Sequence, residues 1–208
     1  MYVPTHFAPP SPDAVRDLLD HHGAADLVTA TADGLLATLL PFVVDPGDDG
    51  GPGVLRGHVA RNNPQWRTDP IGPAMVIVRG PDAYVSPSWY ASKAEHGRVV
   101  PTWNYVTAHV YGDLVVHDDA AWTERVVRDL TGKHEAGREP AWSVDDAPER
   151  YLTGQLRAIV GIEVVVRRVE AKWKLSQNRS TDDVDGVIGA VDPEIATIMT
   201  EVRDAGRA

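Results

Sequence analysis

The alternation of apolar and polar positions along this chain predicts a mainly β protein with helices at intervals. Alternating or β-branched runs predict strands over residues 27–31, 35–44, 54–60, 74–79, 83–86, 108–117 and 159–169. Asp33-Gly34 is typical of a hairpin turn, and Gly80-Pro81 is expected to separate the two strands around it. Six or seven strands joined by hairpins favour an antiparallel barrel with peripheral helices, an α+β fold, over a doubly wound sheet.

Apolar residues spaced three or four apart predict the helices. One covers residues 13–22 after a Ser11 cap, one passes through residues 122–130 after Asp118 or Asp119, one covers residues 146–156, and the last follows Asp192. Residues 45–53, rich in Gly, Pro and Asp, are expected to form a loop. We expect one domain over residues 1–180, with a C-terminal helical segment, residues 181–208, packed on it.

Composition removes several classes of function. The 208 residues carry 30 Asp and Glu against 20 Lys and Arg, a formal charge of −10, and no basic helix, so direct nucleic-acid binding is doubtful. The lack of cysteine excludes disulfides, thiolate catalysis and Cys-based zinc sites. No apolar run approaches the roughly 18 residues of a membrane span, and the N-terminus lacks the layout of a signal peptide. The sequence predicts a cytoplasmic protein without a membrane anchor.

The segment Gly57-His58-Val59-Ala60-Arg61-Asn62-Asn63-Pro64 is the first candidate site. It places an imidazole, a guanidinium and two amides at the end of a strand, where free backbone N–H groups and the planar donors of Arg61 suit a phosphate. The alternative is structural, with Arg61 in a salt bridge and Asn62 capping a turn.

Two further segments combine aromatic and polar side chains. Ser86 and Trp89, and then Thr102, Trp103 and Asn104, lie in turn-rich stretches suited to a flat ligand or a partner subunit, or to an aromatic corner under a loop. The segment Lys172-Trp173-Lys174-Leu175-Ser176-Gln177-Asn178-Arg179 is the densest cationic part of the chain, and alternation places its two lysines on one face. Its functional interpretation is a phosphate or carboxylate site that includes Lys172, Lys174 and Gln177. The structural alternative for the same segment is a solvated edge strand.

Signatures of catalysis and metal binding are missing from the sequence. There is no His-Glu-x-x-His motif, no glycine-rich phosphate loop before a helix and no Gly-x-Ser-x-Gly elbow. No pair of histidines has metal-ligand spacing, so no metal site and no catalytic residue are predicted.

Several motifs, taken in their order along the chain, resemble those of the PaiB family of FMN-binding negative transcriptional regulators. The matching segments are Met1-Tyr2-Val3-Pro4, Gly57-His58-Val59-Ala60-Arg61, Tyr84-Val85-Ser86-Pro87-Ser88-Trp89-Tyr90, Val100-Pro101-Thr102-Trp103-Asn104-Tyr105 and Lys172-Trp173-Lys174-Leu175-Ser176-Gln177-Asn178. The resemblance implies an antiparallel split barrel similar to pyridoxine-phosphate oxidases, acting as a homodimer with FMN at the subunit interface. It assigns His58, Arg61, Asn62 and Asn63 to the phosphate. The later aromatic and Lys/Gln residues then lie near the isoalloxazine ring or the partner subunit.

The resemblance also leaves alternatives to a regulator. One related branch, similar to piperazate synthase, binds haem and forms a nitrogen–nitrogen bond, and His58 would be the axial ligand if haem b were the cofactor here. A flavin oxidoreductase on the same barrel and a cofactor-binding scaffold without activity are the remaining hypotheses.

Overall fold

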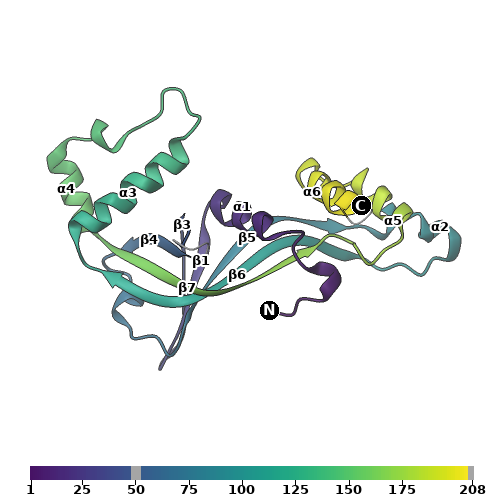
Figure 1. Ribbon diagram of the computed structural model, residues 1–208, viewed down its shortest axis with the longest axis horizontal. Coiled ribbons are helices and arrows are strands. Elements are labelled where there is room, and N and C mark those ends of the chain that lie inside the picture. The colour runs from purple at the N-terminus through teal and green to yellow at the C-terminus, as the bar shows by residue number, and fades with distance from the viewer. Residues whose placement is uncertain (48–52, 206–208) are drawn as a thin grey trace. The chain divides into compact units, whose positions relative to one another are not determined.

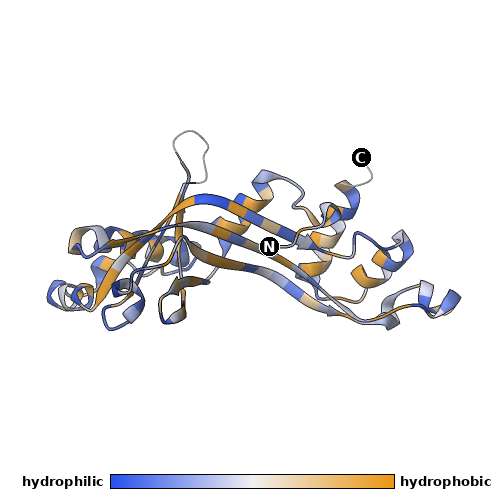
Figure 2. Cartoon of the chain, turned by 90° about the horizontal axis from the view of Figure 1, so that it is seen from below, coloured by the Kyte–Doolittle hydropathy of each residue, from blue (hydrophilic) through white to orange (hydrophobic). Residues whose placement is uncertain are grey.

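The computed structural model describes residues 1–47 and 53–205, and these residues form a seven-stranded sheet with the strand order β2-β1-β5-β6-β7-β4-β3 (Figure 1). The strands are β1 (Ala25–Thr31), β2 (Gly34–Leu40), β3 (Val43–Asp45), β4 (Val54–Ala60), β5 (Ala74–Val85), β6 (Thr102–His117) and β7 (Ile159–Lys174). Pairs β1–β2, β1–β5, β3–β4 and β4–β7 are antiparallel, as predicted. Hydropathy changes repeatedly along the strands (Figure 2), as expected when neighbouring side chains point to opposite faces.

The α-helices are α1 (Pro12–His21), α2 (Ser92–His96), α3 (Ala120–Glu135), α4 (Glu149–Arg157), α5 (Thr181–Ile188) and α6 (Pro193–Ala205). Short 3₁₀ turns are η1 (Thr5–Phe7), η2 (Pro64–Arg67), η3 (Pro87–Trp89) and η4 (Val144–Asp146). No helix among the described residues is both long and apolar enough to cross a membrane.

The chain forms two compact units. The first comprises the described parts of Met1–Leu18, Arg79–Ala108 and Glu170–Ala208, and the second those of Leu19–Val78 and His109–Val169. Strands β5, β6 and β7 contribute residues to both units. Helices α5 and α6 belong to the first unit, and α3 and α4 belong to the second.

In the second unit, α3 lies over β4 and contributes to a small hydrophobic core. Asp119 caps α3, because its carboxylate accepts a 2.6 Å hydrogen bond from the N–H of Trp122. Val126 and Leu130 are buried with Val43, and Trp122 packs against them. The predicted spacing of four between these helical residues therefore marks the face that α3 buries.

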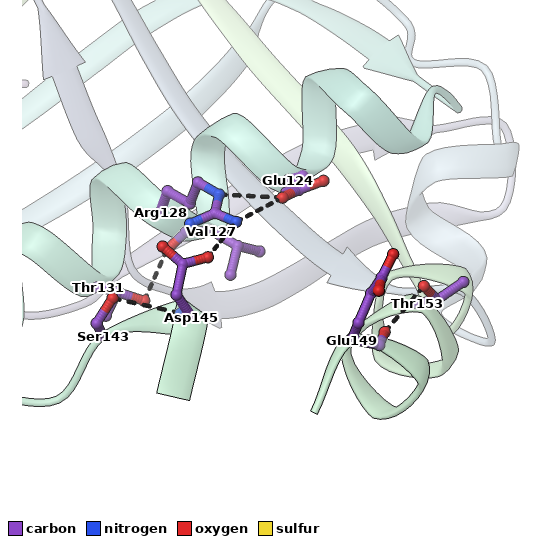
Figure 3. Close-up of polar contacts among 8 residues, drawn as sticks. All are labelled: Glu124, Val127, Arg128, Thr131, Ser143, Asp145, Glu149 and Thr153. Atoms are coloured by element: carbon purple, nitrogen blue, oxygen red, sulfur yellow. Dashed lines mark hydrogen bonds and ion pairs between the residues drawn. The ribbon is translucent and has the colours of Figure 1, made fainter. Parts of the chain in front are cut away.

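A single arginine fixes the chain that follows α3. Arg128 donates to Glu124 one turn earlier and to Asp145 of η4, at 2.8 Å in each case (Figure 3). η4 itself carries a capping box, in which Ser143 and Asp146 satisfy each other's backbone N–H groups. Both partners of Arg128 raise its pKa, so the guanidinium stays charged and is already neutralised within the fold.

In the first unit, α5 packs against α6 and against the η3–α2 segment. Asp183 of α5 accepts hydrogen bonds from the N–H and the hydroxyl of Ser92, at 2.9 and 2.8 Å. A Cβ at Gly186 would lie 2.1 Å from the carbonyl oxygen of Trp89, so this contact requires glycine. Helix α5 lies within the helical segment expected over residues 181–208 but was not predicted as a separate helix, although Ser180 caps it and Val184 and Val187 follow with helical spacing.

Two strand predictions were wrong in detail. The expected break at Gly80-Pro81 is absent, because β5 runs unbroken through it. The pairing of β5 with β1 extends to Ile77, so no β1 carbonyl requires the N–H that Pro81 lacks. Conversely, residues 35–44 are not one strand, since Pro41 separates β2 from β3. Residues 102–105, expected in a turn-rich stretch, begin strand β6. Part of the predicted loop, residues 48–52, lies outside the described residues.

Two glycines of the second unit allow a matched test of the packing of α3. A Cβ at Gly161 of β7 would lie 2.4 Å from the Trp122 ring, so we expect Gly161→Ala to reduce the free energy of unfolding by about 1–3 kcal/mol. Gly132 of α3 has open space around it, so Gly132→Ala should raise stability by about 0.5–1 kcal/mol. Urea unfolding of both variants measures the difference, and equal effects would show that Trp122 does not occupy this position.

Candidate functional site

His58 lies in the β4–β7 ladder, directly opposite Gly161. Opposed residues of an antiparallel pair share a face, so its imidazole lies on the same face as the Trp122 ring that covers Gly161. Burial lowers the pKa of His58, and its Nδ1 is buried without a hydrogen-bond partner. The imidazole is therefore neutral at pH 7 and adds no positive charge for a phosphate.

Arg61 is held by protein groups on three sides. Its guanidinium binds both carboxylate oxygens of Asp118, at 2.7 and 3.1 Å, and also donates to the carbonyls of Arg157 and Ile159. Asp118 and Arg61 each favour the charged form of the other, which lowers the pKa of the carboxyl. This is the salt bridge of the structural alternative, and a phosphate would have to compete with it.

The two asparagines that follow differ in what they contact. Asn63, and not Asn62, caps the next turn: its carbonyl accepts from the N–H of Gln65 at 2.9 Å, and its amide donates to Thr38 at 2.8 Å. Asn62 is exposed, and the structure records no side-chain hydrogen bond for it. Gln65, which the sequence analysis missed, is buried and donates to Leu27 and Thr29. Of the four predicted phosphate residues, Arg61 and Asn63 thus have structural contacts and His58 is uncharged.

In the first unit, Lys172 is buried among aromatic rings. Its ammonium lies 5.6, 5.6 and 5.5 Å from the ring centroids of Tyr2, Phe7 and Tyr105, and it donates to the carbonyl of Tyr2 at 3.2 Å. These distances are within the range of cation–π attraction. No ion pair is recorded for Lys172 within the described residues, which is unusual for a lysine only 8% exposed.

Lys174 lies on the same face of β7, as the alternation predicted. Its ammonium is 5.9 Å from the Tyr105 ring and donates to the Thr102 hydroxyl at 2.7 Å and to the carbonyl of Trp103. Burial lowers the pKa of Lys174, and the charges of Lys172 and Arg179 lower it further. Across the described parts of the chain, none of these three cations has a carboxylate partner.

The turn after β7 is fixed by a buried polar network. Ser176 has a φ of 68°, rare for a residue other than glycine, and its hydroxyl donates to the Asn104 carbonyl at 3.1 Å. Asn104 is fully buried, and its amide contacts the sulfur of Met199 at 3.4 Å. Both ends of the Gln177 amide bind the backbone, at Leu175 and Trp173. Asn104 and Gln177 therefore shape the turn and have few polar groups left for a ligand.

The remaining predicted residues are two half-buried residues of the η3 turn and one residue of an exposed aromatic surface. Ser86 caps η3 through the N–H of Ser88 at 3.2 Å, and the carbonyl of Trp89 meets Gly186. Trp103 is 49% exposed, is in edge contact with the equally exposed Tyr84 ring at 6.0 Å, and donates to Asp82 at 2.7 Å. Tyr84 was not among the predicted site residues.

The predicted site residues therefore form two groups. His58, Arg61, Asn62 and Asn63 belong to the second unit, and Ser86, Trp89, Thr102, Trp103, Asn104, Lys172, Lys174 and Gln177 belong to the first. In the second-unit group most polar groups are used within the fold. In the first-unit group, cations without carboxylates lie beside aromatic rings. Tyr105 contacts both lysines and was missed as a site residue, although its motif was noted.

Comparison with known proteins identifies the family of this chain. Residues 1–168 match the family model described as "Putative FMN-binding domain". The protein named "Protease synthase and sporulation protein PAI 2" from Bacillus subtilis is 32% identical over 189 residues, 90% of this chain and 87% of that protein.

Solved structures confirm the fold class. The FAD and haem binding protein from Mycobacterium smegmatis superposes with a TM-score of 0.57 at 17% identity, covering 88% of this chain and 80% of that one. The flavocytochrome Anf3 from Azotobacter vinelandii gives a TM-score of 0.61 at 13% identity, covering 88% and 78%. At these identities the likeness concerns the fold alone, which is the predicted split barrel.

The contacts of Arg61 lead to a test of its role. We expect Arg61→Gln to lower the melting temperature, because it breaks the bonds to Asp118 and to two carbonyls. If these contacts are the main role of Arg61, the Arg61→Gln variant should lose the same factor of affinity for FMN and for riboflavin, which lacks the phosphate. Titration of both flavins measures this, with Asp118→Asn as the matched variant. A much larger loss for FMN alone would instead assign Arg61 to the phosphate.

Proposed function

This chain belongs to the PaiB family of FMN-binding split-barrel proteins, and on that premise we propose that it binds FMN as a homodimer, with the cofactor at the subunit interface. The observation that carries the proposal is the group of cations in the first unit. Lys172 and Lys174 lie beside Tyr105 and have no carboxylate partner among the residues that the structure describes, in a chain with a net charge of −10.

The residues of the first unit fit the chemistry of a flavin. Lysines without counter-ions favour an electron-rich or anionic ligand, and the partly exposed rings of Trp103 and Tyr84 offer flat apolar area for a conjugated ring. We propose that Lys174, Thr102 and Trp103 lie near the isoalloxazine ring, with Lys172, Asn104 and Gln177 supporting them. Ser86 and Trp89 shape the adjoining loop.

From the family resemblance we propose that His58, Arg61, Asn62 and Asn63 lie near the phosphate of FMN. Arg61 would then exchange part of its contact with Asp118 for the phosphate, and Asn62 has no recorded side-chain hydrogen bond within the described residues. In a homodimer, the two groups of residues need not come from the same subunit.

The regulatory role is part of the proposal and rests on the family, with support from the B. subtilis relative whose name refers to protease synthesis and sporulation. The acidic charge argues against direct contact with DNA.

One observation favours a second candidate, a haem-dependent enzyme. His58 is neutral and carries an unpartnered buried Nδ1, and a neutral imidazole is the form that coordinates iron. If haem b were the cofactor, His58 would be the axial ligand, and the chemistry supplied by the iron would replace that of a flavin.

His58→Ala separates the two cofactors. We expect the purified protein to show the two-banded visible spectrum of an oxidised flavin, and His58→Ala to weaken flavin binding only modestly, because His58 supplies no charge. The absorption spectra of both proteins, each reconstituted with FMN and separately with haem, give the answer. A Soret band in the parent protein that collapses in His58→Ala would favour haem, since the axial ligand sets the electronic state of the iron.

The proposed dimer predicts that Trp103 is covered by the second copy. We expect Trp103→Glu to shift the protein toward the monomer, since a charge would be buried without a partner. Light scattering after size exclusion measures the mass. Trp142→Glu is the matched control, because Trp142 is also 49% exposed but belongs to the second unit. A monomeric parent protein at micromolar concentration would contradict the proposed assembly.

A further inference from the structure

A cavity of about 400 Å³ lies within the first unit, lined by residues of η1, the turn after β7, α5 and α6. Its volume is in the range of small-molecule sites. Apart from Gln177, none of its lining residues was predicted to bind the cofactor.

The inner wall of the cavity is apolar. Leu175, Val184 and Met199 are 2%, 7% and 1% exposed, and Val202 of α6 completes this wall. These side chains provide no hydrogen-bonding groups apart from the weakly accepting sulfur of Met199, which already contacts Asn104. The rest of the lining adds polar side chains, among them His6, Gln177 and Thr181, so the cavity suits a ligand with an apolar body and a polar end.

One unneutralised charge lies at this cavity. The Arg179 guanidinium stacks on Tyr90, 4.7 Å from the ring centroid, and no hydrogen bond or ion pair is recorded for its side chain within the described residues. Arg203, also in the lining, is bound by Asp185 at 2.6 Å and by Asp204 at 2.9 Å. The planar donors of Arg179 are thus available to a carboxylate, while those of Arg203 are largely used.

The position of Arg179 is set before any ligand binds. The backbone N–H of Arg179 donates to the carbonyl of Ser176 at 3.0 Å, and this hydrogen bond closes the turn. Ser176 in turn binds Asn104, and Asn104 contacts Met199 in the apolar wall. The turn that carries the charge and the helix that forms the wall therefore share one buried network, which reduces the ordering that binding would require.

We propose that this cavity binds a small monocarboxylic acid with an apolar body, its carboxylate on Arg179 and its body against Leu175, Val184 and Met199. A single free guanidinium matches a single negative charge. The carboxylates of Asp185 and Asp204, held by Arg203, disfavour a dianion such as a phosphate monoester. This ligand is additional to the proposed flavin, as a substrate or an effector.

The test uses benzoate as the probe and benzamide as its uncharged analogue, with binding to the full chain followed by NMR titration. We expect benzoate to bind and benzamide to bind at least about 10-fold more weakly, as for the loss of a charge-assisted hydrogen bond. The Arg179→Gln substitution should weaken the binding of benzoate by the same factor. Arg16→Gln is the matched control, because Arg16 is an exposed arginine of the same unit that lies outside the cavity.

Val202→Trp gives a second, independent variant, because it fills the cavity and leaves Arg179 in place. Benzoate binding should be lost in this variant also. Equal affinities for benzoate and benzamide, no effect of Arg179→Gln, or equally tight Arg179-dependent binding of inorganic phosphate would each overturn the proposal.

Competition with FMN separates this site from the cofactor site. FMN that displaces benzoate would place the cavity within the flavin site and overturn the proposal of a separate ligand. FMN and benzoate that bind together would support it. A protein that binds benzoate in the expected way but takes up no flavin would refute the proposed function and leave this site standing.

Discussion

The β4–β7 ladder fixes where His58, Arg61 and the Trp122 contact lie in the second unit. Val54 to Ala60 pair in register with Val165 to Ile159, which places His58 opposite Gly161 and Arg56 opposite Glu163. A shift by one residue would move every side chain of β4 to the other face. Gly161 leaves the space that Trp122 fills, and Arg61, just after β4, ties the end of the ladder to Asp118. The register of the β4–β7 ladder therefore fixes both the place of Trp122 of α3 and the contacts of Arg61.

The polar groups of the two units are used differently. In the second unit, Arg56, Arg61 and Arg128 each have carboxylate partners. In the first unit, Lys172, Lys174 and Arg179 have none within the described residues, and burial, followed by repulsion from Lys172 and Arg179, lowers the pKa of Lys174. Such a group of cations is a candidate ligand site, because a bound anion would supply the opposite charge. This contrast supports placing ligand binding in the first unit.

Local signals in the sequence predicted the elements that depend on local chemistry. Ser11, Asp119 and the residues after Asp192 mark helix starts that the structure confirms, and the hairpin at Asp33-Gly34 joins β1 to β2. Gly80-Pro81 misled the prediction, because whether proline interrupts a strand depends on the neighbouring strand and not on the proline. Helix α5 was not predicted as a separate helix although its cap and spacing were visible.

The sequence by itself determined the family, the mainly antiparallel fold and the shared face of Lys172 and Lys174, because motif order and alternation are properties of the chain. Only the tertiary structure decided which polar groups remain available. Arg61 and Arg179 are chemically identical, yet Arg61 is bonded to Asp118, 57 positions away, and Arg179 lies on Tyr90 beside a cavity. The carboxylate that binds Arg61 lies far along the chain, so its position depends on long-range packing, and the residues next to Arg61 do not encode it.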